Sequence, residues 1–175
     1  MSYRPDSAVT VICIHYSATP IEKSFTAADI DRMHRKRGFS GIGYHYYIRR
    51  DGLVELGRDM SKAGKWQQGA HCRGSNATSI GICCEGGVKA SAPNVGFDSR
   101  TPAQIKSQIA LIRDLLVRFP GAQVIGHMDM PKASTQCPGF DATEWWDRVM
   151  TAPDPVQNPI AAIIAAIMAF FGKVK

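Results

Sequence analysis

The hydrophobic residues of this chain follow two periodicities, and the changes between them divide it into strands and helices. Residues 8–14 alternate and are rich in β-branched side chains, which predicts a strand that delivers His15 at its end. Residues 78–84 are almost all apolar, which is typical of a central strand covered on both faces. Residues 122–126 form a third apolar run, directly before His127. Two of the predicted strands therefore end at a histidine.

Two further strands are predicted on either side of a tight turn. Residues 44–50 and 53–56 carry strand-forming side chains, and Asp51-Gly52 separates them. An Asp-Gly pair favours a type I′ turn, because both central residues of that turn have positive φ. The sequence therefore predicts an antiparallel hairpin here.

Helices are predicted where start signals precede apolar residues at helical spacing. Thr26 and Asp29 form a capping box for a helix that ends at Gly38, where a left-handed C-cap is expected. Thr101-Pro102 supplies an N-cap and an N1 proline for a longer helix. The apolar side chains expected to pack this second helix on the sheet are Ile105, Ile109, Ile112, Leu115 and Leu116. His34, on the first helix, is expected to be solvated or half-buried.

Strands with helices between them predict a single α/β domain with a mixed central β-sheet flanked by helices. A loop rich in Gly, Pro and Ser is predicted over residues 85–100, and a short helix around Glu144-Trp145-Trp146. We expect the domain to span residues 1–150, which is long enough to build a hydrophobic core.

The composition changes after residue 150. Pro153 and Pro155 would break a helix, so residues 151–158 are predicted to form a linker. Asn158-Pro159 then starts a predicted apolar helix over residues 159–175. Its bulky stripe and cationic end consist of Ile160, Ile163, Ile164, Ile167, Phe171, Lys173 and Lys175.

The predicted tail helix is too short to span a bilayer. Its 14 residues from Pro159 to Gly172 would extend ~21 Å, against a hydrocarbon core of ~30 Å. Two interpretations remain. The helix packs on the domain or on a second copy, or it lies in an anionic membrane with its lysines among the headgroups. We favour the membrane.

The net charge of +6 and a pI near 9.2 favour an anionic partner. Nucleic acid, an anionic membrane and an acidic wall polymer all satisfy this condition. The basic residues Arg32, Arg35, Lys36 and Arg37 fall on one predicted helix, which suggests a nucleic-acid-binding regulator as one alternative. A basic run is usually a solvated face, and the sequence contains no recognisable nucleic-acid-binding motif. We therefore expect no nucleic-acid partner.

The five cysteines do not form a disulfide framework. Their number is odd, and the adjacent Cys83 and Cys84 would point to opposite faces of a strand. This pattern indicates synthesis in a reducing compartment. We expect Cys13, Cys72, Cys83 and Cys84 to be inert, with Cys72 the first to check for oxidation. Residues 1–6 lack an apolar segment, so no signal peptide is predicted.

His15, His127 and Cys137 are the candidate metal ligands. Two strand-end histidines and a cysteine in a loop fixed by Pro138-Gly139 supply three ligands, of two types that Zn²⁺ accepts. Three protein ligands leave a position for water, which describes a catalytic zinc. Spacing alone also fits an alternative without metal, namely a strand-capping histidine and a buried cysteine.

Several motifs stand in a fixed order between residues 9 and 146. They are His15-Tyr16-Ser17-Ala18-Thr19, Gly43-Tyr44-His45-Tyr46, Arg50-Asp51-Gly52, Gly57-Arg58-Asp59, Gly69-Ala70-His71 with Asn76, Ser79-Ile80-Gly81-Ile82, Gly126-His127, Cys137-Pro138-Gly139-Phe140 and Trp145-Trp146. With these motifs the chain resembles the type-2 N-acetylmuramoyl-L-alanine amidases, which include phage lysozyme-like endolysins and are related to the animal peptidoglycan recognition proteins. The resemblance implies that fold, and hydrolysis of the amide between N-acetylmuramic acid and the L-alanine of the stem peptide.

The resemblance also implies roles for individual residues. The zinc ligands match His15, His127 and Cys137, and the catalytic tyrosine matches Tyr44. The Tyr44 phenol is expected to donate to the oxyanion of the reaction, a role typically worth ~3 kcal/mol. Phage members usually carry a lysine two residues before the ligand cysteine. Here that residue is Thr135, as in the recognition proteins, and we expect it to position the oxyanion or the substrate.

Substrate contacts are expected from His71, Asn76 and Lys132. The sequence does not decide which group acts as the general base. The candidates are a zinc-held water, Tyr44, His71 and Lys132. A recognition module that binds peptidoglycan without cutting it is the alternative function. That branch typically lacks the ligand cysteine, so Cys137 favours an enzyme.

The resemblance, together with the missing signal peptide, implies a phage or prophage endolysin. We expect the protein to be made in the host cytoplasm and to reach the cell wall after the inner membrane is breached. Its expected partners are peptidoglycan and, through the tail, an anionic membrane, and it is expected to be a monomer.

Overall fold

The computed structural model describes residues 2–152 of the 175-residue chain. The chain divides into two compact units, Met1–Thr143 and Glu144–Lys175. The predicted tail helix and residues 153–158 of the predicted linker lie outside the described residues. Within residues 2–152, no helix is long and apolar enough to cross a membrane.

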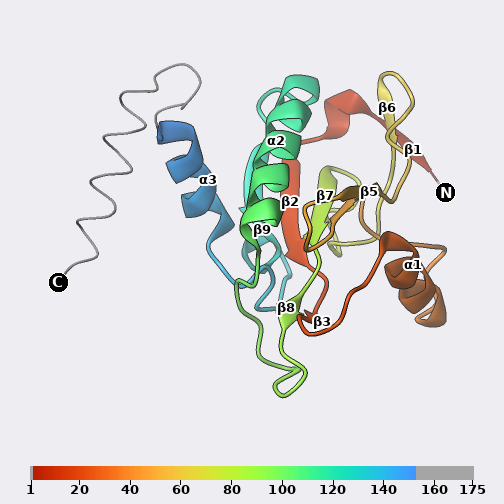
Figure 1. Ribbon diagram of the computed structural model, residues 1–175. Coiled ribbons are helices and arrows are strands. Elements are labelled where there is room, and N and C mark those ends of the chain that lie inside the picture. Colours follow the sequence, from red (N-terminus) through yellow and green to blue (C-terminus); the bar gives the residue numbers. More distant parts are fainter. Residues whose placement is uncertain (1, 153–175) are drawn as a thin grey trace. The chain divides into compact units, whose positions relative to one another are not determined.

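A five-stranded sheet forms the centre of the first unit (Figure 1). Its order is β5-β4-β7-β2-β9, and β5 alone among these five runs antiparallel to its neighbour. The five strands are β2 (Val11–Tyr16), β4 (Tyr46–Ile48), β5 (Val54–Leu56), β7 (Ser79–Cys84) and β9 (Gln123–Gly126). Every residue of β7 is buried, which confirms the predicted central strand and the mixed sheet.

Two small sheets and two 3₁₀ turns were not predicted. The small sheets pair β1 (Tyr3–Pro5) with β6 (Lys65–Gln67), and β3 (Thr19–Pro20) with β8 (Gly87–Val88). The turns are η1 (Asp6–Ala8) and η2 (His127–Asp129). Pieces of two or three residues are too short to show a hydrophobic period. The remainder of the predicted 85–100 loop has no regular structure beyond β8.

The predicted hairpin forms, but its turn is not type I′. The Gly52 N–H donates to the Arg49 carbonyl at 2.8 Å, and the Arg49 N–H donates to the Leu53 carbonyl at 2.9 Å. Gly52 has a φ of 88°, whereas Asp51 keeps a negative φ and its carboxylate accepts the Leu53 N–H. The connection is therefore a three-residue loop that ends in a left-handed glycine.

Helix α1 (Ala27–Lys36) begins and ends as predicted. The Thr26 hydroxyl accepts the Asp29 N–H at 3.2 Å, and the Asp29 carboxylate accepts the Thr26 N–H at 2.8 Å. Gly38 follows the helix with a φ of 87°. These contacts are local, which is why the sequence reveals them.

Helix α1 covers one face of the sheet. Ile30 of this helix packs in one buried cluster with Tyr47 of β4 and Cys83 of β7. Cys83 pairs in register with His15 of β2, so His15 lies on the same face. The site residues of β2 therefore project toward the α1 side.

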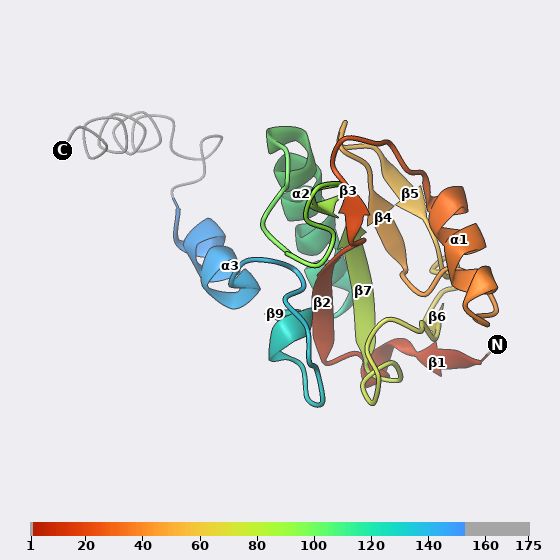
Figure 2. The same cartoon turned by 90° about the horizontal axis from the view of Figure 1, so that it is seen from below.

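Helix α2 (Pro102–Arg118) lies along the opposite face of the sheet. Tyr46 points away from the Tyr47 side, and its pKa is raised by burial and then influenced by Arg118 and Asp114 of α2. Figure 2 shows α1 and α2 well separated, with strands of the sheet between them. One face of β2 thus carries the site residues on the α1 side, and the other face packs toward α2.

The packing face of α2 includes polar residues that were not predicted. Ile112 and Leu115 are buried, but Ile105, Ile109 and Leu116 are only half-buried. Gln104 and Gln108 occupy fully buried positions instead. The Gln104 amide donates to the carbonyls of Ile48 and Glu85 at 3.0 Å each, and these carbonyls lie just at the ends of β4 and β7. The Ile48 carbonyl also accepts the Glu85 N–H at 2.9 Å, so Gln104 adds a second donor there and gives the Glu85 carbonyl a buried partner.

The short helix predicted around Trp145-Trp146 is α3 (Ala142–Thr151).

Candidate active site

The three predicted metal ligands lie together. One nitrogen from each of His15 and His127 and the sulfur of Cys137 all lie within 4.8 Å of one another. His15 belongs to β2, His127 begins the turn after β9, and Cys137 lies in the following loop. Since β2 and β9 are parallel neighbours, their carboxyl ends bring the two histidines to the same place.

Backbone hydrogen bonds hold Cys137 against β2. The Tyr16 N–H donates to the Cys137 sulfur at 3.3 Å, and the Met128 N–H donates to the Cys137 carbonyl at 2.6 Å. The Thr135 hydroxyl accepts the Cys137 N–H at 3.1 Å. The ligand loop is therefore anchored to both histidine-bearing segments.

The two histidines are neutral at neutral pH. Burial, followed by repulsion from His71 and His127, lowers the pKa of His15 well below its usual range, and burial lowers the pKa of His127. Burial also raises the pKa of the Cys137 thiol to about 12, although the Tyr16 N–H opposes this shift. A divalent cation would therefore meet two free imidazole lone pairs and would displace one thiol proton.

A second group of potential ligands shares His15. Ligand atoms of Cys13, His15 and His71 also lie within 4.8 Å of one another. Cys13 is fully buried within β2. Neither Cys13 nor His71 is among the described residues that line the cavity beside His15. This second group therefore lacks direct access for a substrate.

The Cys137 group faces a cavity of about 190 Å³. Tyr44 and Thr135 line it together with His15, His127 and Cys137. The opposite wall comes from α1 and the residues beside it, which the sequence had not linked to the site. That wall consists of Ile30, Met33, His34 and Arg37.

His34 is buried, not solvated or half-buried as predicted. It is only 8% exposed, and its Nδ1 accepts the Gly43 N–H at 3.0 Å. Its ring also lies 5.4 Å from the Tyr44 ring, measured between centroids. Ile30 and His34 are one helical turn apart, and this spacing of buried positions was the available signal that α1 faces inward.

The Tyr44 ring packs beside His15, one of the three candidate ligands. Its ring centroid is 5.2 Å from that of His15. Burial, followed by the charges of Cys83 and Cys137, raises the pKa of its phenol well above the usual range. The phenol consequently keeps its proton at neutral pH, and its side chain lies within hydrogen-bonding reach of the Cys83 thiol.

The three residues expected to contact substrate do not line this cavity. The side-chain Oδ1 of Asn76 accepts the backbone N–H groups of His71 and Cys72, both at 2.8 Å, and so fixes their turn. Lys132 adopts a φ of 66° and lies beside Gly74. Among the described residues, the cavity lining contains none of His71, Asn76 and Lys132.

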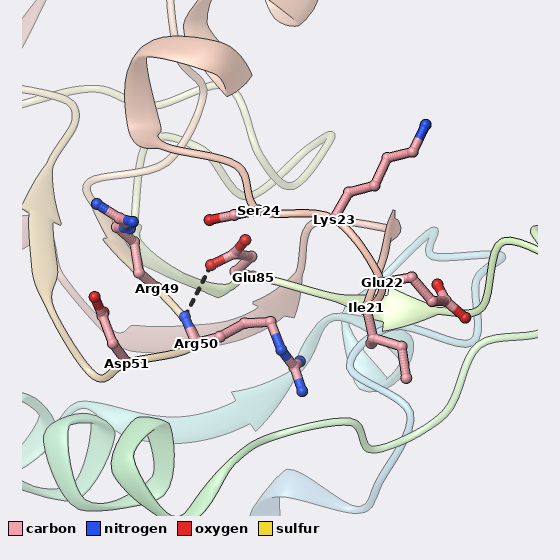
Figure 3. Close-up of a pocket in the computed structure, with 8 residues that line it drawn as sticks. All are labelled: Ile21, Glu22, Lys23, Ser24, Arg49, Arg50, Asp51 and Glu85. Carbon is pink, nitrogen blue, oxygen red and sulfur yellow. Dashed lines mark hydrogen bonds between the residues drawn. The ribbon is translucent and has the colours of Figure 1, made fainter.

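A larger cleft of about 340 Å³ lies near the hairpin loop (Figure 3). Its carboxylates hold the backbone in place, since Glu85 accepts the Phe25 N–H at 2.6 Å and the Arg50 N–H at 2.8 Å. Its lining contains no histidine or cysteine. Size alone therefore does not identify the reactive cavity.

The chain is similar to cell-wall amidases and phage endolysins. The profile of the N-acetylmuramoyl-L-alanine amidase family matches residues 5–140. The endolysin of Klebsiella phage KP32 is 39% identical over 139 residues, which cover 78% of this chain and 85% of the relative. The endolysin of Escherichia phage T7 is 35% identical over 150 residues, covering 85% and 92%.

Solved structures show the same fold. The N-acetylmuramoyl-L-alanine amidase LysC from Clostridium intestinale URNW superposes with a TM-score of 0.66 at 30% identity, covering 86% of this chain and 89% of that one. The bumblebee recognition protein PGRP-SA has a TM-score of 0.64 at 23% identity, covering 84% of each chain, and shares the fold. With a family match over most of its length and phage relatives above 30% identity, the chain belongs to the N-acetylmuramoyl-L-alanine amidase family and is an enzyme of that class.

Proposed function

We propose that this amidase is a zinc-dependent phage endolysin that cleaves the amide between N-acetylmuramic acid and the L-alanine of the stem peptide. The observation that carries the proposal is the convergence of His15, His127 and Cys137 at the wall of an accessible cavity. The endolysins of two phages are its relatives, and peptidoglycan is the polymer that this class of enzyme cuts.

The donor set suits zinc. Two neutral imidazoles and one thiol are ligands that Zn²⁺ prefers, and three protein ligands leave one tetrahedral position open. When bound, zinc supplies a Lewis acid that polarises the scissile carbonyl and lowers the pKa of a water. His15, His127 and Cys137 would hold it, and both histidines are already neutral.

The chain's other residues have separate tasks. Tyr44 keeps its phenolic proton and donates a hydrogen bond to the carbonyl oxygen as negative charge develops there. Thr135 holds the Cys137 loop through its acceptor oxygen, which leaves its hydroxyl hydrogen free for the substrate. Tyr44 and His71 are poor general bases, because the first stays protonated and the pKa of the second is lowered to about 4 by burial.

The α1 wall provides the remaining substrate contacts. Arg37 places a cation at the cavity, and Met33 adds an apolar, 42% exposed side chain. Stem peptides carry carboxylates, so Arg37 is suited to pair with one of them.

The alternative of a recognition module that binds without cutting is disfavoured by the presence of the complete ligand trio. The membrane-binding tail, the domain boundaries near residues 150 and 158, and the monomeric state are further parts of this proposal. They rest on the sequence pattern alone.

Mass spectrometry of digested sacculi tests the proposal directly. The protein should release stem peptides that begin with a free L-alanine amine and leave glycan strands that carry intact lactyl groups. A chelator-treated sample and the Cys137→Ser variant serve as controls and should release neither product. Cleavage within the glycan or between peptide residues would overturn the proposed function.

A further inference from the structure

We propose that His71 is a positioning residue that fixes the orientation and tautomer of His15, and not a substrate contact. The inference rests on the proposed zinc site, because it assigns His71 to the support of one of its ligands.

The hydrogen bonds around His71 determine where its proton lies. Nε2 of His71 is 3.2 Å from the Ser79 carbonyl, which can only accept. The Ser79 hydroxyl is 3.5 Å from the same nitrogen, but its hydrogen is used toward the Ser75 carbonyl at 2.7 Å. Nε2 therefore carries the hydrogen, and Nδ1 of His71 is a bare acceptor.

This acceptor then determines the tautomer of His15. Nδ1 of His71 lies 3.0 Å from Nε2 of His15. Since the His71 nitrogen can only accept, Nε2 of His15 must donate. The lone pair of His15 is left on Nδ1, the atom 3.7 Å from the Cys137 sulfur. The chain of contacts thus presents the correct nitrogen to the ligand cluster before any metal arrives.

Two glycines create the space for this ring. A Cβ at Gly81 would lie 2.6 Å from Cγ of His71, and a Cβ at Gly69 would lie 2.8 Å from its Cδ2. Asn76 fixes the backbone through the His71 N–H at 2.8 Å. The ring is therefore held against β7 beneath His15, and it is not part of the cavity lining.

The experiment compares three variants for zinc affinity by chelator competition. His71→Phe keeps a ring in the slot but removes the acceptor. His71→Asn retains an acceptor near the position of Nδ1. His45→Phe is the control, because His45 is buried beside His71 but its nitrogens contact the Gly81 N–H and the Gln67 carbonyl.

We expect His71→Phe to weaken zinc binding about 10- to 100-fold. His71→Asn should recover most of that loss, and His45→Phe should lower the melting temperature while leaving zinc affinity within about threefold. With zinc saturating, KM for a soluble muropeptide should be unchanged in His71→Phe. Normal zinc affinity together with a raised KM in His71→Phe would overturn the inference and would indicate that His71 contacts the substrate.

A measurement on the wild-type protein does not depend on how the variants fold. Nitrogen-15 correlation spectra of the imidazoles should show hydrogen on Nε2 of both His15 and His71. Hydrogen on Nδ1 of His15 would overturn the inference. Failure of the wild-type protein to bind zinc at all would instead overturn the proposed function, so the two failures are distinguishable.

Discussion

The sulfur of Cys137 lies 3.7 Å from Nδ1 of His15, although 122 positions separate the two residues in the chain. The contact exists because the Tyr16 N–H, next to His15 in β2, binds the same sulfur. The ligand cluster is thus built on β2, a strand that is hydrogen-bonded to β7 on one side and to β9 on the other. Metal binding should therefore depend on the side chains more than on the fold.

Exchange of cysteines distinguishes the two potential ligand groups. Cys137→Ser should lose the zinc and nearly all amidase activity, because serine is a far poorer ligand for zinc than a thiolate. Cys13→Ser, the matched control from the second group, should keep about one zinc per chain. Metal analysis and circular dichroism measure both effects. Zinc loss in Cys13→Ser with retention in Cys137→Ser would assign the metal to the buried group.

Removal of the Tyr44 hydroxyl tests the oxyanion role. Tyr44→Phe should lower turnover by ~10²-fold with little change in zinc content, because one transition-state donor is lost while the ring remains. Tyr46→Phe is the control, since that phenol faces α2 on the other side of the sheet. Steady-state kinetics on a soluble muropeptide supply the comparison. Equal turnover in both variants would make Tyr44 a packing residue.

Local signals predicted much of this fold. The capping box at Thr26 and the N-cap at Thr101 with its N1 proline involve only residues at most three apart, so the sequence displays them. The apolar run of β7 likewise predicts that this strand is buried. Such features need no knowledge of the rest of the chain.

Features that depend on distant partners were missed. Nothing in the sequence marks Gln104 as buried, because its amide donates to the carbonyls of Ile48 and Glu85, which lie far away in the chain. His34 was expected to be solvated or half-buried, because the Gly43 N–H that its ring accepts comes from outside the helix. The expected substrate role of His71 came from resemblance, and only the structure shows its contacts with His15 and Ser79.

Acid should destabilise the metal-free protein. Burial is the main cause that lowers the pKa of all five histidines in the folded state. Below the unfolded-state histidine pKa of ~6.5, the unfolded chain binds protons that the folded chain does not bind. The free energy of unfolding therefore falls as the pH drops, by up to ~1.4 kcal/mol per pH unit for each histidine. For His71 the loss continues to its folded pKa of about 4.

Urea unfolding of chelator-treated protein between pH 4.5 and 7.5 measures this effect. The unfolding free energy should be flat above about pH 7 and should decline below about pH 6.5. His45→Gln removes one titrating group and should reduce the slope. A free energy that does not change between pH 7 and 5 would contradict the burial of neutral histidines.

Arg37 is expected to contribute to substrate binding and not to turnover. Arg37→Gln should raise KM for a muropeptide with free carboxylates by about tenfold, since a charge-assisted hydrogen bond is lost, and should leave kcat within about twofold. Arg32→Gln is the control, because Arg32 pairs with Asp29 on the same helix and is not among the residues that line the cavity. Identical KM values for the two variants would show that Arg37, at the end of α1, does not contact the substrate.

The last prediction concerns residues 159–175, whose bulky stripe and terminal lysines suggest binding to an anionic membrane. Truncation after Met150 should leave hydrolysis of isolated peptidoglycan intact but abolish binding to vesicles that contain anionic lipid. In the full chain, Ile167→Asp places a charge on the stripe and should weaken vesicle binding strongly. Ala166→Asp places the same charge on the alanine face and should weaken it much less. Should the truncated protein unfold, or should both Asp variants bind vesicles like the wild type, the tail packs on protein and not on membrane.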